Sequence, residues 1–160
     1  MTRPTFKFLF SDPAHLLSLG FGSGLSRVAP GTVGSLLAWG IYVLSRGYFS
    51  DLGFAVFLMV SIVAGVWIVA RTGRALGVVD HGGIVWDEFV AVWLVLWLTP
   101  ATWLWQLTAV IVFRIFDIVK PWPIRQADKR FKNGFGVMFD DILAAGYTLL
   151  IIVIMQRMPI

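Results

Sequence analysis

Carboxylates stand beside long apolar stretches at three places in this sequence. Asp87 and Glu88 lie within "GIVWDEFVAVWLVLWLTP", Asp117 lies near the end of "ATWLWQLTAVIVFRIFDIV", and Asp140 and Asp141 precede "ILAAGYTLLIIVIM". A carboxylate moved to the centre of a bilayer costs about 3 kcal/mol, so acids in such segments are rare and usually functional. These five residues are therefore the first candidates for chemistry.

The ligand types in the chain indicate which ion these acids would hold. Several carboxylates gathered at one level repel each other unless cations neutralise them. The chain has no cysteine and only two histidines, so the available ligands are oxygens, which suit hard divalent ions such as Mg²⁺. We expect one or two magnesium ions, held by Asp87, Glu88, Asp117, Asp140 and Asp141.

Cationic side chains stand near the same acids and could bind a phosphate group. Arg114 precedes Asp117 by one helical turn and Lys120 follows it, while Arg27 lies in the glycine-rich stretch "GFGSGLSRVAPGTVGS", which leads into an expected helix start at Thr32. Backbone amides of glycine loops at helix N-termini bind anions. Carboxylates for a metal beside cations for a phosphate form the layout required for phosphoryl chemistry on a lipid headgroup.

Each of these features also has a purely structural interpretation, which the sequence leaves open. Glu88 or Asp140 could stabilise a helix N-terminus through the helix dipole. Arg114 and Asp117 could form a simple ion pair at i,i+3. His81 could be a loop residue without a role, and the basic stretch 125–132 could be a loop that faces solvent or headgroups. The tryptophans could anchor the membrane interface and pack within the bundle.

Composition and apolar segments predict the elements that position these residues. Of the 160 residues, 58% are hydrophobic and only 14% charged, whereas about 25% are charged in a soluble domain. The length favours one domain over residues 1–160. We expect an all-α, polytopic membrane helix bundle, with a short interfacial or re-entrant element over 15–28. The expected spans, about five, are 33–49, 52–70, 84–99, 101–119 and 141–156.

The distribution of charge predicts the orientation of the bundle. With the N-terminus in the cytoplasm, ten of the thirteen Lys and Arg residues fall on the cytoplasmic side, as the positive-inside rule requires. Eight of the nine acids fall on that side as well, and only Asp51 falls outside. The candidate site therefore faces the cytoplasm. The basic residues are too scattered for a nucleic-acid footprint, so no nucleic acid is expected as a partner.

Four motifs in order carry a resemblance to a known family. They are "GSGLSRVAPGTVGSL", "DHGGIVWDEFVAVW", "FRIFDIVKPWPI" and "GFGVMFDDILAAG", and together they cover most of residues 20–150. The chain resembles the phosphatidylglycerophosphatase A family of bacterial membrane lipid phosphatases. The resemblance implies an all-helical fold and magnesium-dependent hydrolysis of phosphatidylglycerophosphate to phosphatidylglycerol at the inner membrane. Ala91 and Asn133 stand where this family commonly has glycine.

The resemblance supports these positions as motif members, and their roles are our inference. The absence of cysteine excludes a phosphocysteine route, and we favour attack by a metal-activated water over an aspartyl-phosphate. Asp80 or His81 would protonate the leaving glycerol oxygen. The candidate catalytic residues are Asp80, His81, Asp87, Glu88, Asp117 and Asp141. The candidate substrate-binding residues are Arg27, Thr32, Arg114 and Lys120.

Two other functions remain as alternatives. Acids at a membrane edge could serve a small ion or proton-coupled transporter, but a transporter needs charges near the midplane and a route to the far face. Another lipid phosphate could replace phosphatidylglycerophosphate as substrate. The sequence does not indicate the oligomeric state.

Overall fold

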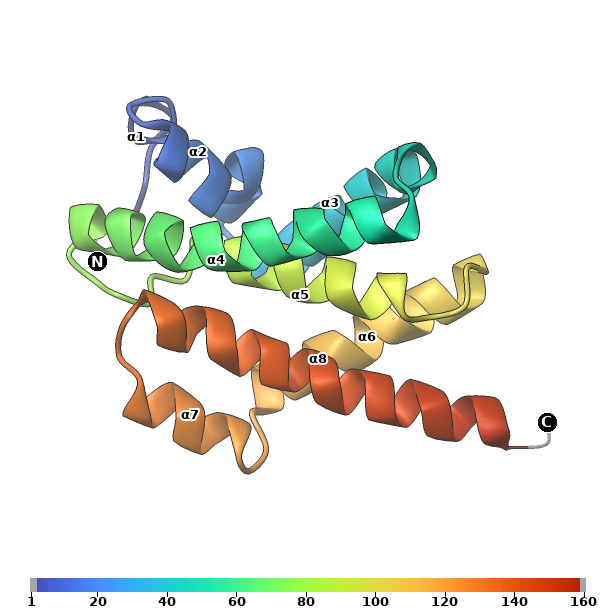
Figure 1. Cartoon of the computed structure of the whole chain (residues 1–160). Helices are drawn as coiled ribbons and strands as arrows, with labels where there is room; N and C mark the ends of the chain where they lie inside the picture. The colour runs from blue at the N-terminus through green and yellow to red at the C-terminus, as the bar shows by residue number, and fades with distance from the viewer. Residues whose placement is uncertain (1–2, 159–160) are drawn as a thin grey trace.

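The computed structural model describes residues 3–158, and every regular element within that range is helical (Figure 1). The predicted all-α fold is confirmed. In chain order the elements are α1 (Phe6–Leu9), α2 (Pro13–Ser18), η1 (Gly20–Leu25), α3 (Pro30–Ser45), η2 (Arg46–Tyr48), α4 (Asp51–Leu76), α5 (Trp86–Trp97), α6 (Trp103–Val119), α7 (Ile124–Arg130) and α8 (Gly134–Arg157), where η marks a 3₁₀ helix.

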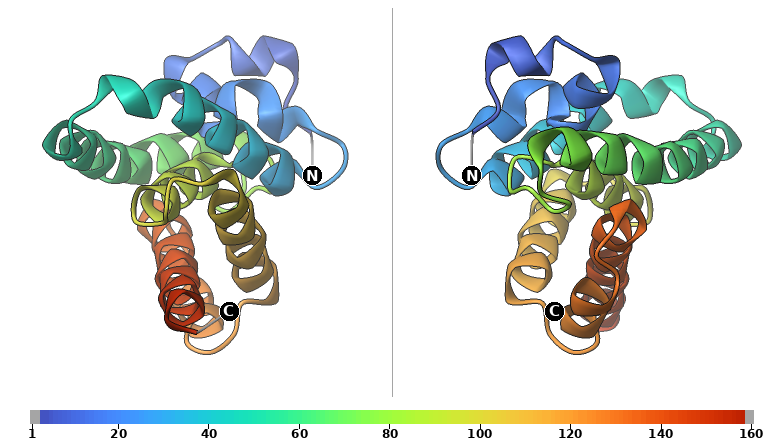
Figure 2. Two further views of the ribbon diagram at one scale, coloured as in Figure 1. Left: turned by 90° about the vertical axis from the view of Figure 1, so that its right-hand side faces the viewer. Right: turned by 90° about the vertical axis from the view of Figure 1, so that its left-hand side faces the viewer.

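Helix α5 forms the centre of the molecule. Nine of its twelve residues are buried, as expected for a helix that is apolar on all sides. Helices α3, α4, α6 and α8 all pack against it. Seen along the bundle, α5 lies between α3 and α4 on one side and the pair α6 and α8 on the other (Figure 2). The first turn of α5, with its two acids, is therefore surrounded by other helices.

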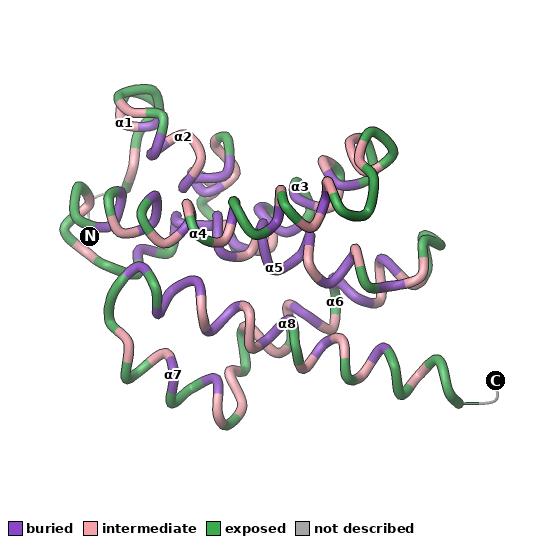
Figure 3. Tube along the Cα trace, in the orientation of Figure 1, coloured by how far each residue is buried: buried purple, intermediate pink, exposed green. Residues whose placement is uncertain are grey.

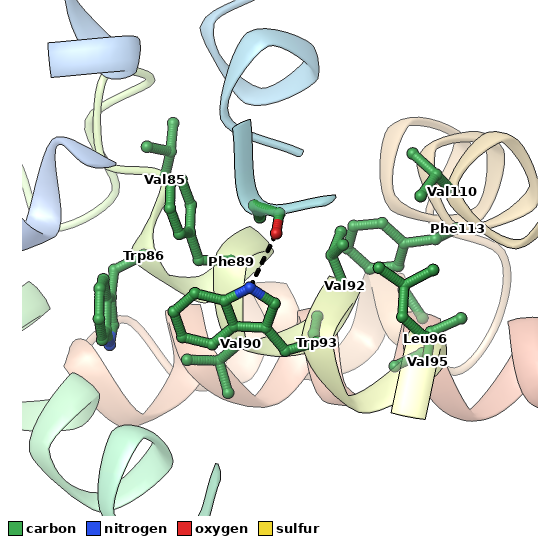
Figure 4. Close-up of a cluster of buried hydrophobic side chains, with 14 of the residues drawn as sticks. Val85, Trp86, Phe89, Val90, Val92, Trp93, Val95, Leu96, Val110 and Phe113 are labelled. Carbon is green, nitrogen blue, oxygen red and sulfur yellow. Dashed lines mark hydrogen bonds between the residues drawn. The ribbon is translucent and has the colours of Figure 1, made fainter. Parts of the chain in front are cut away.

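Aromatic side chains of α5 form much of the core (Figure 4). Trp93 donates its indole N–H to the carbonyl of Ala38 in α3 at 2.9 Å, and Trp86 donates to the carbonyl of Ser61 in α4 at 3.2 Å. These bonds satisfy polar groups that burial would otherwise leave unpaired. Both tryptophans are therefore core residues, which agrees with the prediction that the tryptophans serve as packing residues and interfacial anchors. Others are exposed, as expected of interfacial anchors: Trp67, Trp103 and Trp122.

Two helices are long and apolar enough to cross a membrane, α4 and α8. With 26 and 24 residues, they span roughly 39 and 36 Å at 1.5 Å per residue, more than the ~30 Å of a bilayer's hydrocarbon core. Their outward faces are largely exposed (Figure 3). Helix α5 has 12 residues, or roughly 18 Å. The count of five spans therefore stays a prediction.

Short helices occupy the N-terminal segment, where the sequence predicts an interfacial or re-entrant element. Asp12 caps α2 by accepting a hydrogen bond from the backbone N–H of Ala14 at 2.8 Å. Its other oxygen accepts from Arg71 Nε of α4 at 2.8 Å. The hydrogen bonds from Arg71 and Ala14 lower the pKa of Asp12 below its ordinary value. Asp12 thus stays charged at neutral pH and ties α2 to α4.

Two predicted helix starts and one predicted loop are wrong, and glycine or proline explains the two helix starts. Helix α8 starts at Gly134 and not at residue 141, because Asn133 caps it by accepting from the N–H of Gly136 at 2.9 Å. The glycines that follow disfavour a helix by propensity alone and so conceal its start. Helix α3 starts at Pro30 and not at Thr32, since proline suits the first helical turn. The basic stretch 125–132, expected as a loop, is mostly helix α7.

Candidate active site

The predicted site residues lie on helices and loops that meet at one end of the bundle, toward the left in Figure 1. That end contains the starts of α3, α5 and α8 and the end of α6. Helix α8 packs against both α5 and α6, and α3 packs against α5 and α6. Acids from three separate segments therefore face the same region, and ion pairs divide them into groups.

Arg114 of α6 organises the first group. Its guanidinium contacts the Glu88 carboxylate at 2.9 Å and the Asp117 carboxylate at 2.6 Å. The i,i+3 pair with Asp117 therefore exists, but the same arginine also links α6 to α5. Gly31 of α3 packs directly on this pair, since a Cβ there would lie 2.0 Å from Glu88 Oε1. A glycine is required at that position for the helices to approach.

Lys120 organises the second group. It ends α6 in a left-handed conformation, with φ of 44°, and its ammonium contacts Asp140 of α8 and, at 3.3 Å, Asp128 of α7. Burial disfavours its charge, but the hydrogen bond and charges of Asp140 and Asp128 outweigh this and raise the pKa of Lys120. Lys120 is therefore a permanent cation that joins α6, α7 and α8.

Asp87 and Asp141 have no cationic partner within residues 3–158. They are 9% and 3% exposed, and Asp87 Oδ1 and Asp141 Oδ2 accept no hydrogen bond. Leaving a charge buried and unpaired costs several kcal/mol, about 3–5 when a partner is removed. A buried acid without a partner is therefore stable only if it is protonated or if another group, such as a cation, neutralises its charge.

The helix-cap interpretation can now be decided for α8. Its cap is Asn133, and Asp140 and Asp141 lie two turns further along. A carboxylate stabilises the dipole only within the first turn, so neither acid acts as a cap. Asp87 and Glu88 do lie in the first turn of α5, and for them a contribution to the dipole remains.

The ligand chemistry at this end fits a magnesium ion. Buried carboxylate oxygens without a hydrogen-bond partner occur on four acids there: Asp87, Glu88, Asp140 and Asp141. Across residues 3–158, however, no three acidic or histidine side chains converge closely enough to form a metal cage. Magnesium usually keeps several waters and binds through one or two carboxylates plus substrate phosphates. The residues therefore match that mode of binding, with Asp87 and Asp141 as the carboxylates that lack any other partner.

The other predicted residues make no ion pair or hydrogen bond with these acids within residues 3–158. Arg27 and His81 line a hollow of about 640 Å³ on the same end of the molecule. His81 Nδ1 accepts the N–H of Gly83 at 3.0 Å, so the imidazole proton lies on Nε2. In this state His81 suits the role of a hydrogen-bond donor better than the predicted role of general acid. Asp80 is exposed and Thr32 half-buried, and neither side chain makes a hydrogen bond within the described chain.

Two residues near the site were given no role by the sequence. Asp128 pairs with Lys120 and, at 3.6 Å, with Lys132, and the i,i+4 spacing to Lys132 could have indicated that pair. Arg3 lines the same hollow as Arg27. No local pattern could have placed it there, because the two are 24 positions apart and meet only through the fold.

The fold and the site define a class: a membrane-associated helical protein that buries unpaired carboxylates beside basic side chains at one end of its bundle. The family model for phosphatidylglycerophosphatase A matches residues 16–156. The chain belongs to this family.

Named relatives agree with that assignment. The chain is 44% identical over 155 residues to the phosphatidylglycerophosphatase A of Haemophilus influenzae, covering 96% of this chain and 95% of the relative. It is 44% identical over 135 residues to the Escherichia coli protein of the same name, covering 84% and 78%. A Bacteroides thetaiotaomicron protein, provisionally named a phosphatidylinositol-3-phosphatase, is 38% identical over 161 residues and 96% of each chain. No solved structure shows significant similarity.

Proposed function

We propose that this protein is a magnesium-dependent phosphatidylglycerophosphatase of the bacterial inner membrane. It hydrolyses the terminal phosphate of phosphatidylglycerophosphate and leaves phosphatidylglycerol. The names of the two 44% identical relatives support the substrate. The observation that carries the proposal is the pair Asp87 and Asp141, which are buried without a cation beside the two ion-paired groups.

Asp87 and Asp141 would hold the magnesium, with Glu88, Asp117 and Asp140 around them. When bound, the ion would offset phosphate charge and make water a better nucleophile. Asp117 belongs to this set through its pair with Arg114, at 2.6 Å. The protein's own contribution is that ion pairs with Arg114 and Lys120 hold the surrounding acids, Glu88, Asp117 and Asp140, in place before substrate arrives, and such preorganisation is a main source of electrostatic catalysis.

The two central cations have different roles in this proposal. Arg114 holds Glu88 and Asp117, yet its buried Nε–H has no partner and can donate to a phosphate oxygen. Lys120 is already engaged by Asp140 and Asp128, so it positions Asp140 and acts on the phosphate through its charge. The direct grip expected of both residues is therefore proposed for Arg114 alone. Thr32, in the first turn of α3 next to Gly31, remains a candidate phosphate ligand.

Phosphate release from a panel of lipid phosphates tests the proposal. The purified protein in detergent should hydrolyse phosphatidylglycerophosphate with a kcat/KM at least about tenfold above that for phosphatidic acid or phosphatidylinositol 3-phosphate, a difference of about 1.4 kcal/mol in transition-state binding. The third lipid is included because of the Bacteroides relative. Preference for another lipid would mean that this lipid, and not phosphatidylglycerophosphate, is the substrate. No phosphate release from any lipid would favour the transporter alternative.

Topology is a second expected result. We propose that the end of the bundle with the site faces the cytoplasm, because the loops there carry most of the basic residues. A reporter fused after Lys132 should read cytoplasmic, and one fused after Arg157 should read outside. A reporter that is external after Lys132 would place the acids away from newly made lipid and contradict the proposal.

A further inference from the structure

A basic hollow lies next to the acidic site but contains none of its carboxylates. Arg3, Arg27 and His81 line it, together with other residues of the N-terminal segment, of the glycine-rich stretch and of the loop before α5, and no acidic residue is among its lining. Neither arginine has an ion-pair or hydrogen-bond partner within residues 3–158. Arg114 and Lys120, in contrast, already form ion pairs with carboxylates.

Two glycines close the wall of this hollow. A Cβ at Gly24 would lie 1.9 Å from the carbonyl oxygen of Gly83, so the backbones are in direct contact. That contact brings the η1 segment against the loop that carries His81. With Nδ1 bonded to Gly83, the buried imidazole retains its Nε2–H as a donor. Two guanidinium groups and an N–H donor around one concave space form a recognition site for an oxyanion.

The hollow is close enough to the acids for one lipid headgroup to reach both. Pro30 lines the hollow, and the next residue, Gly31, packs on the Glu88 carboxylate. On the other side Gly83 lines the hollow, and Asp87 follows four residues later, which limits the separation of their Cα atoms to about 15 Å. A molecule that bridges the two places needs two anionic groups separated by a short linker.

We propose that this hollow binds the phosphodiester group of the lipid substrate while its terminal phosphate lies beside Asp87 and Asp141. The inference rests on the proposed function, since phosphatidylglycerophosphate carries these two phosphates on one glycerol. Arg3 and Arg27 pair with the diester oxygens, and His81 donates from Nε2. The hollow thereby selects lipids with a diester in addition to a monoester, and it fixes the distance from the membrane at which the monoester lies.

Binding of the product lipid tests this subsite without hydrolysis. Short-chain phosphatidylglycerol retains the diester and lacks the monoester, and its affinity for the detergent-solubilised protein can be measured by titration calorimetry. We expect Arg27→Ala and Arg3→Ala each to weaken binding about tenfold or more, the usual effect of losing a charge-assisted hydrogen bond. Arg125→Ala is the matched control, because it removes the same charge from the exposed surface of α7, and it should bind as the parent protein does.

Two further binding measurements show which part of the lipid the hollow recognises. Short-chain diacylglycerol, which has no phosphate, should bind all variants alike, and inorganic phosphate should not displace phosphatidylglycerol at equal concentration. Efficient displacement would mean that the hollow takes free phosphate, which would overturn the lipid assignment. Parent-like phosphatidylglycerol binding by both arginine variants would overturn the subsite even if the enzyme is an active phosphatase.

Kinetics give the second readout. For phosphatidylglycerophosphate, Arg27→Ala should raise KM about tenfold and lower kcat little, because the diester is bound equally in the ground and transition states. A loss of kcat with unchanged KM would assign Arg27 to the scissile phosphate and contradict the subsite. If the parent protein binds phosphatidylglycerol through Arg27 but releases no phosphate from any lipid, the subsite stands and the proposed reaction fails.

Discussion

Asp141→Asn should lower kcat by about a hundredfold or more, which is about 2.7 kcal/mol of lost transition-state stabilisation. The substitution keeps the shape of the side chain and removes one anionic oxygen, so it tests charge without changing packing. Asp87→Asn should have an effect of similar size, because these two buried acids are the ones without a cationic partner in residues 3–158. Phosphate release from phosphatidylglycerophosphate at saturating magnesium provides the measurement.

The stability of Asp141→Asn should rise or stay unchanged, although its activity falls. Asp141 lies in the interior of α8, where Asn133 provides the cap, so asparagine at position 141 removes no cap. It does remove a buried charge that has no partner, which favours folding. We therefore expect an unchanged or higher thermal midpoint in detergent together with the loss of activity, the combination typical of a residue retained for function.

Asp51→Asn serves as the matched control. It makes the same chemical change at the opposite end of the bundle, on a side chain that is 83% exposed and pairs with Arg46. Exposed pairs contribute about 0–1 kcal/mol, so activity and stability should both stay near those of the parent protein. Near-normal turnover of both Asp141→Asn and Asp87→Asn would refute the carboxylate site and leave the acids without a catalytic role.

The general position of the site could be predicted from the sequence. Apolar segments of helical length alternate in direction, so acids at the starts of two segments and at the end of a third must come to one end of the bundle. That reasoning depends on chain direction and segment length, which a single sequence shows well. It correctly brought Glu88, Arg114 and Asp117 together, and these side chains are in contact.

The pairing among charged residues could not be predicted, because it depends on side-chain contacts across helices. Spacing indicated the Arg114–Asp117 pair, but the approach of Arg114 to Glu88 requires Gly31 of a third helix to leave room. Likewise, Lys120 meets Asp140 and Asp128 only because α7 and α8 fold back over the end of α6. The cations expected to hold phosphate are for this reason largely occupied, and Asp87 and Asp141 are left as the acids in need of a counter-ion.

The sequence predicts flexibility at glycines that in the structure are sites of close packing. The glycines of 20–35 predict a flexible anion-binding loop, and the expected fifth span at 141–156 leaves Gly134 outside its helix. In the structure Gly24, Gly31 and Gly134 are sites of close packing, with a Cβ at each lying 1.9–2.3 Å from a neighbouring atom. Propensity alone cannot distinguish a glycine that permits flexibility from one that permits contact.

Removal of divalent metal should abolish activity, and magnesium should restore it. Four acids at the site have buried carboxylate oxygens without partners, and their mutual repulsion must be offset before a phosphate with further negative charge can approach. Excess chelator should therefore reduce phosphate release to background, with recovery on addition of Mg²⁺. Full activity in excess chelator would exclude the proposed chemistry.

Thermal unfolding separates a resident ion from one that arrives only with substrate. A ligand that binds only the folded protein stabilises it by RT ln(1 + [L]/Kd), about 2.7 kcal/mol at one hundred times Kd. If Asp87 and Asp141 bind magnesium in the free enzyme, Mg²⁺ should raise the thermal midpoint of the parent protein and of Asp51→Asn, but not that of Asp141→Asn. A midpoint that Mg²⁺ raises equally in all three proteins would place the ion elsewhere. If the parent's midpoint is unchanged while activity still depends on magnesium, the ion binds together with the substrate phosphate, the mode that a site with few converging carboxylates favours.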